Sequence, residues 1–167
     1  MGYRHIPAGT PYGVLVTRFA ARSATNRWND RGDPTLYVAG DRGVALAEYA
    51  RHLRESFSPA LGPALAERAL YRLEVHVGAV LDLRDAGVRK ALGLRGDLVR
   101  FLDVAYARAT ANFVRRTTAA EALLVPSVAF LDDPARWNLV LFLEKLPHDL
   151  SRYITATYDG AFRVEVS

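Results

Sequence analysis

Cysteine is absent from this chain of 167 residues, and lysine occurs only at Lys90 and Lys145. Without cysteine the chain has no disulfide, no cysteine nucleophile and no thiolate metal ligand, and this composition fits the cytoplasmic location that we expect. The histidines also lack the spacing of a zinc site, so we predict no metal; they are His5, His52, His76 and His148.

Long apolar runs and several nucleotide or hydrolase motifs are missing as well. The longest apolar runs, such as Leu139–Leu143, are far shorter than the ~20 residues that span a bilayer, and the segment Met1–Ile6 lacks the apolar core of a signal peptide. No Gly-x-Gly-x-x-Gly or Gly-Lys-Ser/Thr motif is present. Ser127 lies in Pro126-Ser127-Val128 rather than in the Gly-x-Ser-x-Gly of a serine hydrolase. We therefore expect no membrane partner, prosthetic group or nucleophilic serine.

Arginine supplies most of the positive charge, and the net charge is +4 with a pI of about 9.6. Arginine binds phosphate and carboxylate bidentately, although an Arg- and Ala-rich composition also follows from a GC-rich genome. The charge suits an anionic ligand but is too small to argue for direct nucleic-acid binding. The length suits one domain over residues 1–167.

The apolar patterns predict a single α+β domain with a central mixed or split β-sheet and flanking helices. We expect buried or half-buried strands, and helices that begin at Asp41, Leu81 and Leu98. The predicted strands are 3–6, 13–17, 35–38, 69–77, 122–125 and 138–143. The predicted helices are 41–53, 81–92 and 98–116, and residues 152–166 are expected to form an edge hairpin that turns at Tyr158-Asp159-Gly160.

Glu48 is the residue that fits its predicted helix least well. It neighbours Val44, Ala45 and His52 on the helical wheel, at the edge of the apolar stripe formed by Leu46, Tyr49, Ala50 and Leu53. A solvated Glu is the more frequent outcome of such spacing, because a buried carboxylate needs a cation or hydrogen-bond donors. Arg27, in the polar loop before the strand at 35–38, is the candidate cation.

Three short motifs resemble those of the RES domain family, named for an arginine, a glutamate and a serine. The first is Arg27-Trp28-Asn29, followed by Gly32 and Thr35-Leu36-Tyr37-Val38-Ala39. The second is Ala45-Leu46-Ala47-Glu48, and the third is Leu123-Leu124-Val125-Pro126-Ser127 with Trp137-Asn138 after it. Each motif is weak alone, but the three occur in order, with a core over residues 26–142 and a resemblance that extends over most of the chain.

The resemblance implies an ADP-ribosyltransferase-like fold and the toxin of a bacterial toxin–antitoxin pair that consumes NAD⁺. It implies that Arg27 binds phosphate or ribose, Tyr37 shapes the nicotinamide pocket, Glu48 stabilises the transition state and Ser127 orients the ligand. Trp28 and Asn138 are further candidates for binding. Taken singly, Trp28 and Tyr37 are better explained as core aromatics and Ser127 as a strand-end hydroxyl. The order of the motifs reverses this preference for Arg27, Glu48 and Ser127. The implied partner is an Xre-type antitoxin with a helix-turn-helix part, and a homodimer is one arrangement within the complex.

Cleavage of the nicotinamide N-glycosidic bond fits these residue types. Its transition state resembles an oxocarbenium ion, which a carboxylate stabilises, while arginine holds diphosphate and an aromatic ring stacks on nicotinamide. Nicotinamide is a competent leaving group, so one carboxylate is sufficient. The acceptor stays open between water and phosphate, and transfer of ADP-ribose to a protein is the alternative reaction. A binding module without turnover is a further alternative, and a basic nucleic-acid binder is a more distant one.

Overall fold

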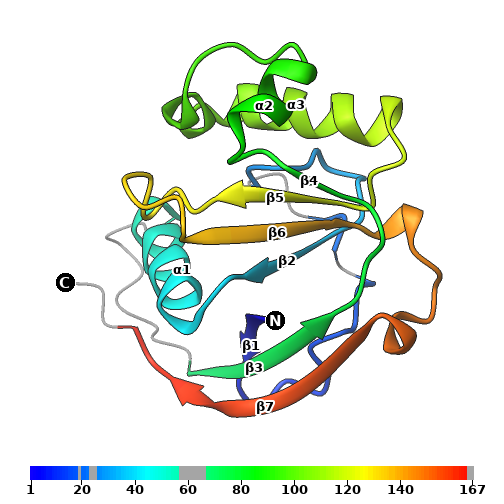
Figure 1. The fold of residues 1–167 in the computed structure, drawn as a ribbon. Coiled ribbons are helices and arrows are strands. Elements are labelled where there is room, and N and C mark those ends of the chain that lie inside the picture. Colours follow the sequence, from blue (N-terminus) through cyan, green and yellow to red (C-terminus); the bar gives the residue numbers. More distant parts are fainter. Residues whose placement is uncertain (19, 23–25, 57–66, 165–167) are drawn as a thin grey trace.

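Within the described residues (1–18, 20–22, 26–56 and 67–164), the computed structural model has seven strands in one mixed sheet, ordered β4-β5-β6-β2-β1-β3-β7 (Figure 1). Only the pair β4–β5 is parallel among these ladders. The strands are β1 Gly2–Pro7, β2 Thr35–Ala39, β3 Arg68–Val75, β4 Val80–Asp82, β5 Ala122–Pro126, β6 Trp137–Phe142 and β7 Ile154–Phe162.

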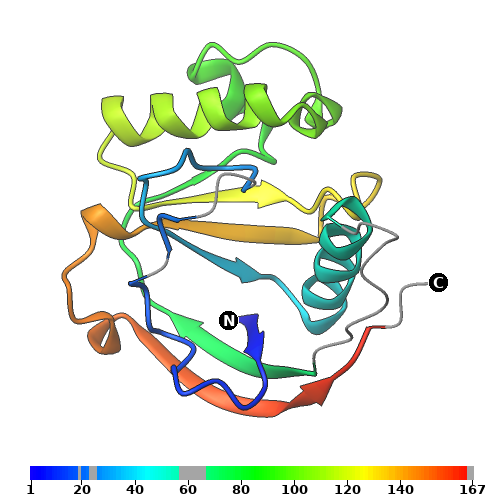
Figure 2. The same cartoon turned by 180° about the vertical axis from the view of Figure 1, so that it is seen from behind.

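Three α-helices flank this sheet in the part of the chain that is described: α1 Arg42–Ser56, α2 Ala86–Ala91 and α3 Val104–Thr117. Short 3-10 helices occur at η2 Leu98–Leu102, η3 Leu143–Lys145 and η4 Leu150–Arg152. The helices α2 and α3 lie together near β4 and β5, whereas α1 stands beside one end of β2 and β6 (Figure 1). Seen from behind, the segment between β1 and β2 passes across the sheet close to α3 (Figure 2). The fold is α+β, as predicted.

The sheet is split between β1 and β2. These strands share one residue pair, Tyr3 with Ala39, whereas β1 pairs with β3 through six consecutive residues. Gly2 permits this close crossing, because a Cβ there would lie 2.6 Å from Ala39 O and from Val38 Cγ1. Beyond the crossing the two halves of the sheet diverge, and α1 lies beside the opening.

The core lies on both faces of β6, which runs between β5 and β2 as the central strand predicted at 138–143. Successive side chains of a strand point to opposite faces. Val140 and Phe142 therefore join the cluster under α3, whereas Leu139 and Leu141 join the cluster with β2 and β7. The buried Arg115 connects α3 to β2 and to η3, since it donates to Thr35 Oγ1 of β2 at 2.8 Å and pairs with Glu144 of η3 at 2.5 Å.

Helix α1 begins where the sequence predicts, because Asp41 Oδ1 accepts a hydrogen bond from Val44 N at 2.9 Å and caps the helix. Its fully buried residues are Val44 and Ala45 rather than the predicted stripe, whose members Leu46, Tyr49, Ala50 and Leu53 are only half-buried. The reason is that part of this face, including Tyr49, borders a cavity instead of the core.

Four predicted elements are wrong in whole or in part. Residues 13–17 form turns, with Val16 N donating to Gly13 O, rather than a strand. The helix predicted at 81–92 is shorter, since residues 80–82 are strand β4 and α2 starts at Ala86. The helix predicted at 98–116 is interrupted at Asp103, whose extended backbone ends η2 and whose carboxylate caps α3.

The predicted C-terminal hairpin is instead a single edge strand. Within the described residues, β7 pairs with β3 along its length, and Asp159 and Gly160 form a bulge opposite Leu70. Gly160 has a φ of +108°, which suits the irregular backbone of a bulge as well as it suits a turn. No helix among the described residues combines the length and the apolar character needed to cross a bilayer.

Candidate active site

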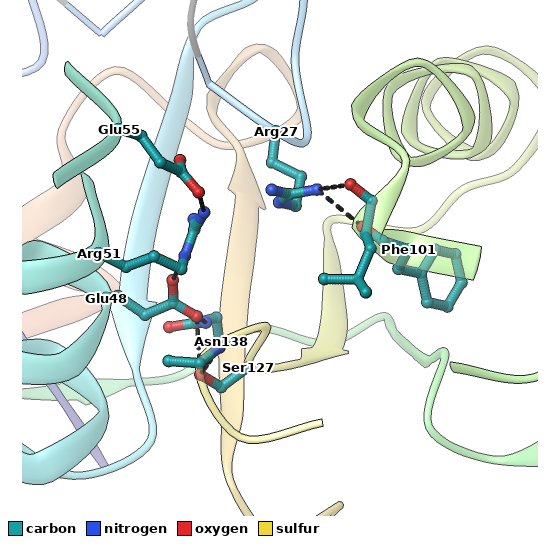
Figure 3. A network of polar contacts seen from close by, with 9 residues as sticks. Arg27, Glu48, Arg51, Glu55, Phe101, Ser127 and Asn138 are labelled. Carbon is teal, nitrogen blue, oxygen red and sulfur yellow. Dashed lines mark hydrogen bonds and ion pairs between the residues drawn. The ribbon is translucent and has the colours of Figure 1, made fainter. Parts of the chain in front are cut away.

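The carboxylate of Glu48 is held by three side chains (Figure 3). Ser127 Oγ donates to Glu48 Oε1 at 2.7 Å, and Asn138 Nδ2 donates to the same oxygen at 3.1 Å. Arg51 Nε lies 3.2 Å from the other oxygen, Oε2. Since an ionised carboxylate only accepts hydrogen bonds, these donors fix its orientation in the charged form.

Strand pairing brings these residues together. Ser127 follows β5 directly, and β5 pairs antiparallel with β6 so that Val125 lies opposite Asn138. Asn138 also lies opposite Ala39, the last residue of β2, from which the chain enters α1. Arg136 completes the link, because its carbonyl accepts from Ser127 N at 2.9 Å and its side chain donates to Asp41, the cap of α1, at 3.1 Å. The serine, the asparagine and the helix bearing Glu48 are thus fixed at one end of the sheet.

A cavity of about 330 Å³ adjoins Glu48, within the range of small-molecule sites. It lies where β1 and β2 diverge and is bounded by α1. All the predicted site residues except Ser127 line it; Ser127 is fully buried behind Glu48. The lining residues with charged or aromatic side chains are Tyr3, Arg4, His5, Arg27, Trp28, Tyr37, Glu48, Tyr49, Arg51, His52 and Glu55.

Arg27 lies across the cavity from Glu48 rather than against it (Figure 3). Its Nη1 donates to the carbonyls of Phe101 at 2.9 Å and Leu102 at 2.5 Å, and its buried Nε has no partner within the described residues. Burial and the nearby charge of Arg51 lower the pKa of Arg27. The prediction that Arg27 is the cation paired with Glu48 is therefore wrong, since that cation is Arg51.

Tyr37 and Trp28 shape the wall next to Arg27. The Tyr37 hydroxyl donates to Asn29 Oδ1 at 2.7 Å and accepts from Trp28 N at 3.1 Å, so it anchors the loop that carries Arg27. Burial raises the pKa of Tyr37 well above its usual range, which keeps the phenol neutral. The Trp28 side chain is only 3% exposed and packs on Phe101 in the core, with ring centroids 5.0 Å apart.

The sequence reasoning missed the cavity residues on β1, which are Tyr3, Arg4 and His5; of these, Arg4 and His5 have shifted pKa values. Arg4 donates to the carbonyls of Tyr37 at 3.1 Å and Val14 at 3.3 Å, and burial together with Arg68 lowers its pKa to about 10. His5 Nδ1 accepts from Arg68 Nε at 3.0 Å, and burial followed by Arg68 lowers the pKa of His5 to about 3. The sequence signal that could have indicated these cavity residues is the adjacent arginine and histidine in a short predicted strand.

A metal ion needs a group of ligand side chains. Within the described ranges, no three His, Asp or Glu side chains gather into a group that would hold one. Around the cavity lie the oriented carboxylate of Glu48, three arginines, the neutral imidazole of His5 and the neutral phenol of Tyr37. Such a set suits an anionic ligand that develops positive charge next to the carboxylate.

Comparisons with known proteins agree with the sequence motifs. The family model described as RES domain matches residues 3–163. A chain of the M. tuberculosis MbcT–MbcA toxin–antitoxin complex, known from a crystal structure, has a similar fold with a TM-score of 0.67 and 21% sequence identity. The likeness covers 97% of this chain and 82% of that one. No curated protein matches the sequence of this chain.

Proposed function

This chain belongs to the RES domain family, and we propose that it is the toxin of a type II toxin–antitoxin system and degrades NAD⁺. The bond cleaved is the N-glycosidic bond between nicotinamide and ribose. The observation that carries the proposal is the Glu48 carboxylate, which Ser127 and Asn138 hold at the wall of an arginine-lined cavity. A carboxylate fixed in this way before the substrate binds is suited to stabilise an oxocarbenium-like transition state.

The two oxygens of Glu48 have different tasks in this reaction. Oε1 is engaged by Ser127 and Asn138, so it orients the group. Among the described residues, Oε2 has Arg51 as its single partner, at 3.2 Å, and it is the oxygen that we assign to the ribose. As the bond to nicotinamide breaks, positive charge develops on the ribose and is attracted to this carboxylate. Nicotinamide leaves as a neutral molecule and needs no general acid.

The remaining residues provide binding. Arg27 and Arg4 both line the cavity and are suited to the negative phosphates. The Tyr37 ring is suited to stack on nicotinamide. Because the Tyr37 phenol is neutral, it does not compete with Glu48 for the positive charge that develops on the ribose. Trp28, with 3% exposure, supports the wall from within the core. The binding roles predicted for Arg27, Tyr37 and Asn138 are part of this proposal.

An antitoxin is the proposed protein partner. The similar chain of known structure comes from a toxin–antitoxin complex. We expect an antitoxin of the Xre type, with a helix-turn-helix part, to cover the cavity and thereby neutralise the toxin. A toxin that consumes a central metabolite must be held inactive until it is released, and occlusion of the ligand site achieves this without a chemical step. A homodimer of the toxin within such a complex is compatible with this arrangement.

The acceptor distinguishes the remaining alternatives. Attack by water gives free ADP-ribose, attack by phosphate gives ADP-ribose-1″-phosphate, and attack by a protein side chain gives an ADP-ribosylated target. In a binding module without turnover, the same cavity would hold a nucleotide intact.

The test is NAD⁺ consumption by the purified chain, with and without phosphate, with products separated by mass. We expect nicotinamide release by the wild type and its loss in Glu48→Gln, which keeps the shape but removes the charge, and in Arg27→Ala. Arg54→Gln is the matched control, because Arg54 is exposed on the same helix and does not line the cavity. If NAD⁺ stays intact in both buffers and labelled NAD⁺ modifies no protein in a lysate, the enzymatic proposal is wrong.

A further inference from the structure

Arg51 occupies a position that neither the motifs nor the proposed roles explain. It lies three residues after Glu48, one turn further along α1, and its side chain lines the cavity. Its Nε contacts Glu48 Oε2 at 3.2 Å, and its Nη1 contacts Glu55 Oε1 on the next turn. Arg51 therefore bridges a site carboxylate, Glu48, and an outer carboxylate, Glu55 (Figure 3).

Neither carboxylate of the bridge binds Arg51 through the two parallel hydrogen bonds of a bidentate pair. The Glu55 side chain is 58% exposed, so its ion pair is screened by water and contributes little. The contact with Glu48 uses a single N–H rather than the bidentate geometry in which guanidinium binds carboxylate best. The Arg51 side chain is 24% exposed and lines the cavity, so a ligand bound there can reach its guanidinium.

A second guanidinium faces the same cavity from the opposite side. Arg27 is close enough for the charge of Arg51 to lower the pKa of Arg27. Arg27 is anchored to two carbonyls, which carry no net charge, and among the described residues it forms no ion pair like those of Arg51 with Glu48 and Glu55. Two like charges directed at one cavity favour an anion between them. The lining as a whole has three arginines and two glutamates, an excess of one positive charge.

We propose that Arg51 is a specificity-determining residue that moves from Glu48 to the diphosphate of the dinucleotide and holds it opposite Arg27. This inference rests on the proposed function. The movement has two consequences. It frees Glu48 Oε2 for the ribose. It also makes the release of Glu48 from Arg51 depend on the phosphates of the ligand, so a nucleoside without phosphates would leave the carboxylate paired with Arg51. The site would thus select a diphosphate-containing ligand over a nucleoside.

The test measures the binding of ADP-ribose by isothermal titration calorimetry. ADP-ribose carries the diphosphate but no nicotinamide bond, so it is not turned over. The variants are Arg51→Gln, Arg51→Lys and the control Arg54→Gln. We expect Arg51→Gln to weaken binding by about tenfold or more, the effect of one lost charge-assisted hydrogen bond. Arg51→Lys should retain much of the affinity, and Arg54→Gln should bind like the wild type.

A double-mutant cycle separates direct phosphate binding from an indirect effect through Glu48. If Arg51 contacts the diphosphate, Arg51→Gln should weaken ADP-ribose binding at least as much in the Glu48→Gln background, where no ion pair with Glu48 has to be broken first. If the loss disappears in that background, or if Arg51→Gln binds as tightly as the wild type, the inference is wrong. A wild-type chain that does not bind ADP-ribose also overturns it.

Parallel NAD⁺ assays keep this inference separate from the proposed function. A chain that binds ADP-ribose in an Arg51-dependent way but neither cleaves nor transfers from NAD⁺ would refute the enzymatic proposal and leave the role of Arg51 intact. If NAD⁺ is cleaved, Arg51→Gln should raise KM more than it lowers kcat.

Discussion

At the scale of single residues, the site depends on how one carboxylate is shared. Glu48 Oε1 accepts from Ser127 and Asn138, while Oε2 meets Arg51. A surface glutamate would be free to rotate among rotamers and would have to be ordered during the reaction. Here the neutral donors order it before any ligand arrives, which is how an active site avoids reorganisation in the transition state.

Ser127→Ala and Asn138→Ala should each lower kcat for NAD⁺. The expected loss is about tenfold or more, because a hydrogen bond to a charged group contributes roughly 1.5–3 kcal/mol. Both donors act on the same oxygen, so the double variant should lose a factor different from the product of the two. Steady-state kinetics of the three variants measure this, with the exposed Ser151→Ala as control. Strictly multiplicative losses would contradict a shared role in orienting Glu48.

His5 should make stability depend on pH. Burial, Arg68, Arg4 and His52 lower its pKa in the fold to about 3, from 6.5 in the unfolded chain. Between these values the unfolded chain binds the proton and the fold does not, so the free energy of unfolding rises with pH from about 3 to 6.5, at most by ~1.4 kcal/mol per unit. Above pH 6.5 the contribution of His5 is constant. Urea denaturation from pH 4 to 7 should show that the free energy of unfolding rises less steeply with pH in His5→Gln than in the wild type. Equal dependences on pH would contradict the prediction.

At the scale of elements, the break in the predicted helix at 98–116 serves the site. Asp103 is extended, so η2 ends at Leu102, and a helix end leaves carbonyls without intrahelical partners. Arg27 donates to two of these, the carbonyls of Phe101 and Leu102. An uninterrupted helix would have used the same carbonyls internally, and Arg27 would have lost its anchor.

The turn from β2 into α1 should tolerate no side chain at residue 40. A Cβ on Gly40 would lie 2.7 Å from the Trp137 indole, which is held in place by β6. Gly40→Ala should therefore destabilise the protein by roughly 1–3 kcal/mol through overpacking. Gly13→Ala is the matched control, since nothing lies within 4 Å of its Cβ, and it should be close to neutral. Chemical denaturation of both variants measures the difference, and similar midpoints would contradict the expectation.

At the scale of the whole molecule, the central strands join the two halves of the core. The cluster under α3 and the cluster toward β7 take alternate residues of β6, such as Val140 and Leu141. Because one strand serves both faces, neither cluster can be lost without exposing the other. This shared strand is the physical argument for the single domain that the length suggests.

Unfolding should accordingly be two-state. Trp28 belongs to the cluster under α3, and Trp137 packs against the other, so each tryptophan reports on one side of the sheet. Trp28→Phe and Trp137→Phe each leave one reporter. We expect the fluorescence transition of each variant to coincide with its own transition in far-UV circular dichroism. A fluorescence transition that precedes the loss of secondary structure would contradict a single cooperative unit.

The sequence by itself determined the elements whose signal is local. Alternation identified β3, a continuous apolar run identified β6, and Asp41 marked the start of α1, because each of these signals depends on neighbouring residues. The motifs also pointed to Arg27, Tyr37, Glu48 and Asn138, which all line one cavity, and to Ser127 behind it. The errors at residues 13–17, 103 and 159–160 occur at a turn, a helix break and a bulge, which tertiary packing determines rather than the local apolar pattern.

Only the tertiary structure decided which of these residues meet. Helix geometry allows Glu48 to contact Arg51, but it was the position of the Arg27 loop against η2 that left this contact as the ion pair of Glu48. Arg4 and His5 joined the site because β1 crosses β2 at a single residue pair and then diverges. Such contacts depend on strand order and on how far the two halves of the sheet separate. Both are determined jointly by residues that lie far apart in the sequence. Local sequence determines which chemistry is available, and the packing of the sheet determines where it is assembled.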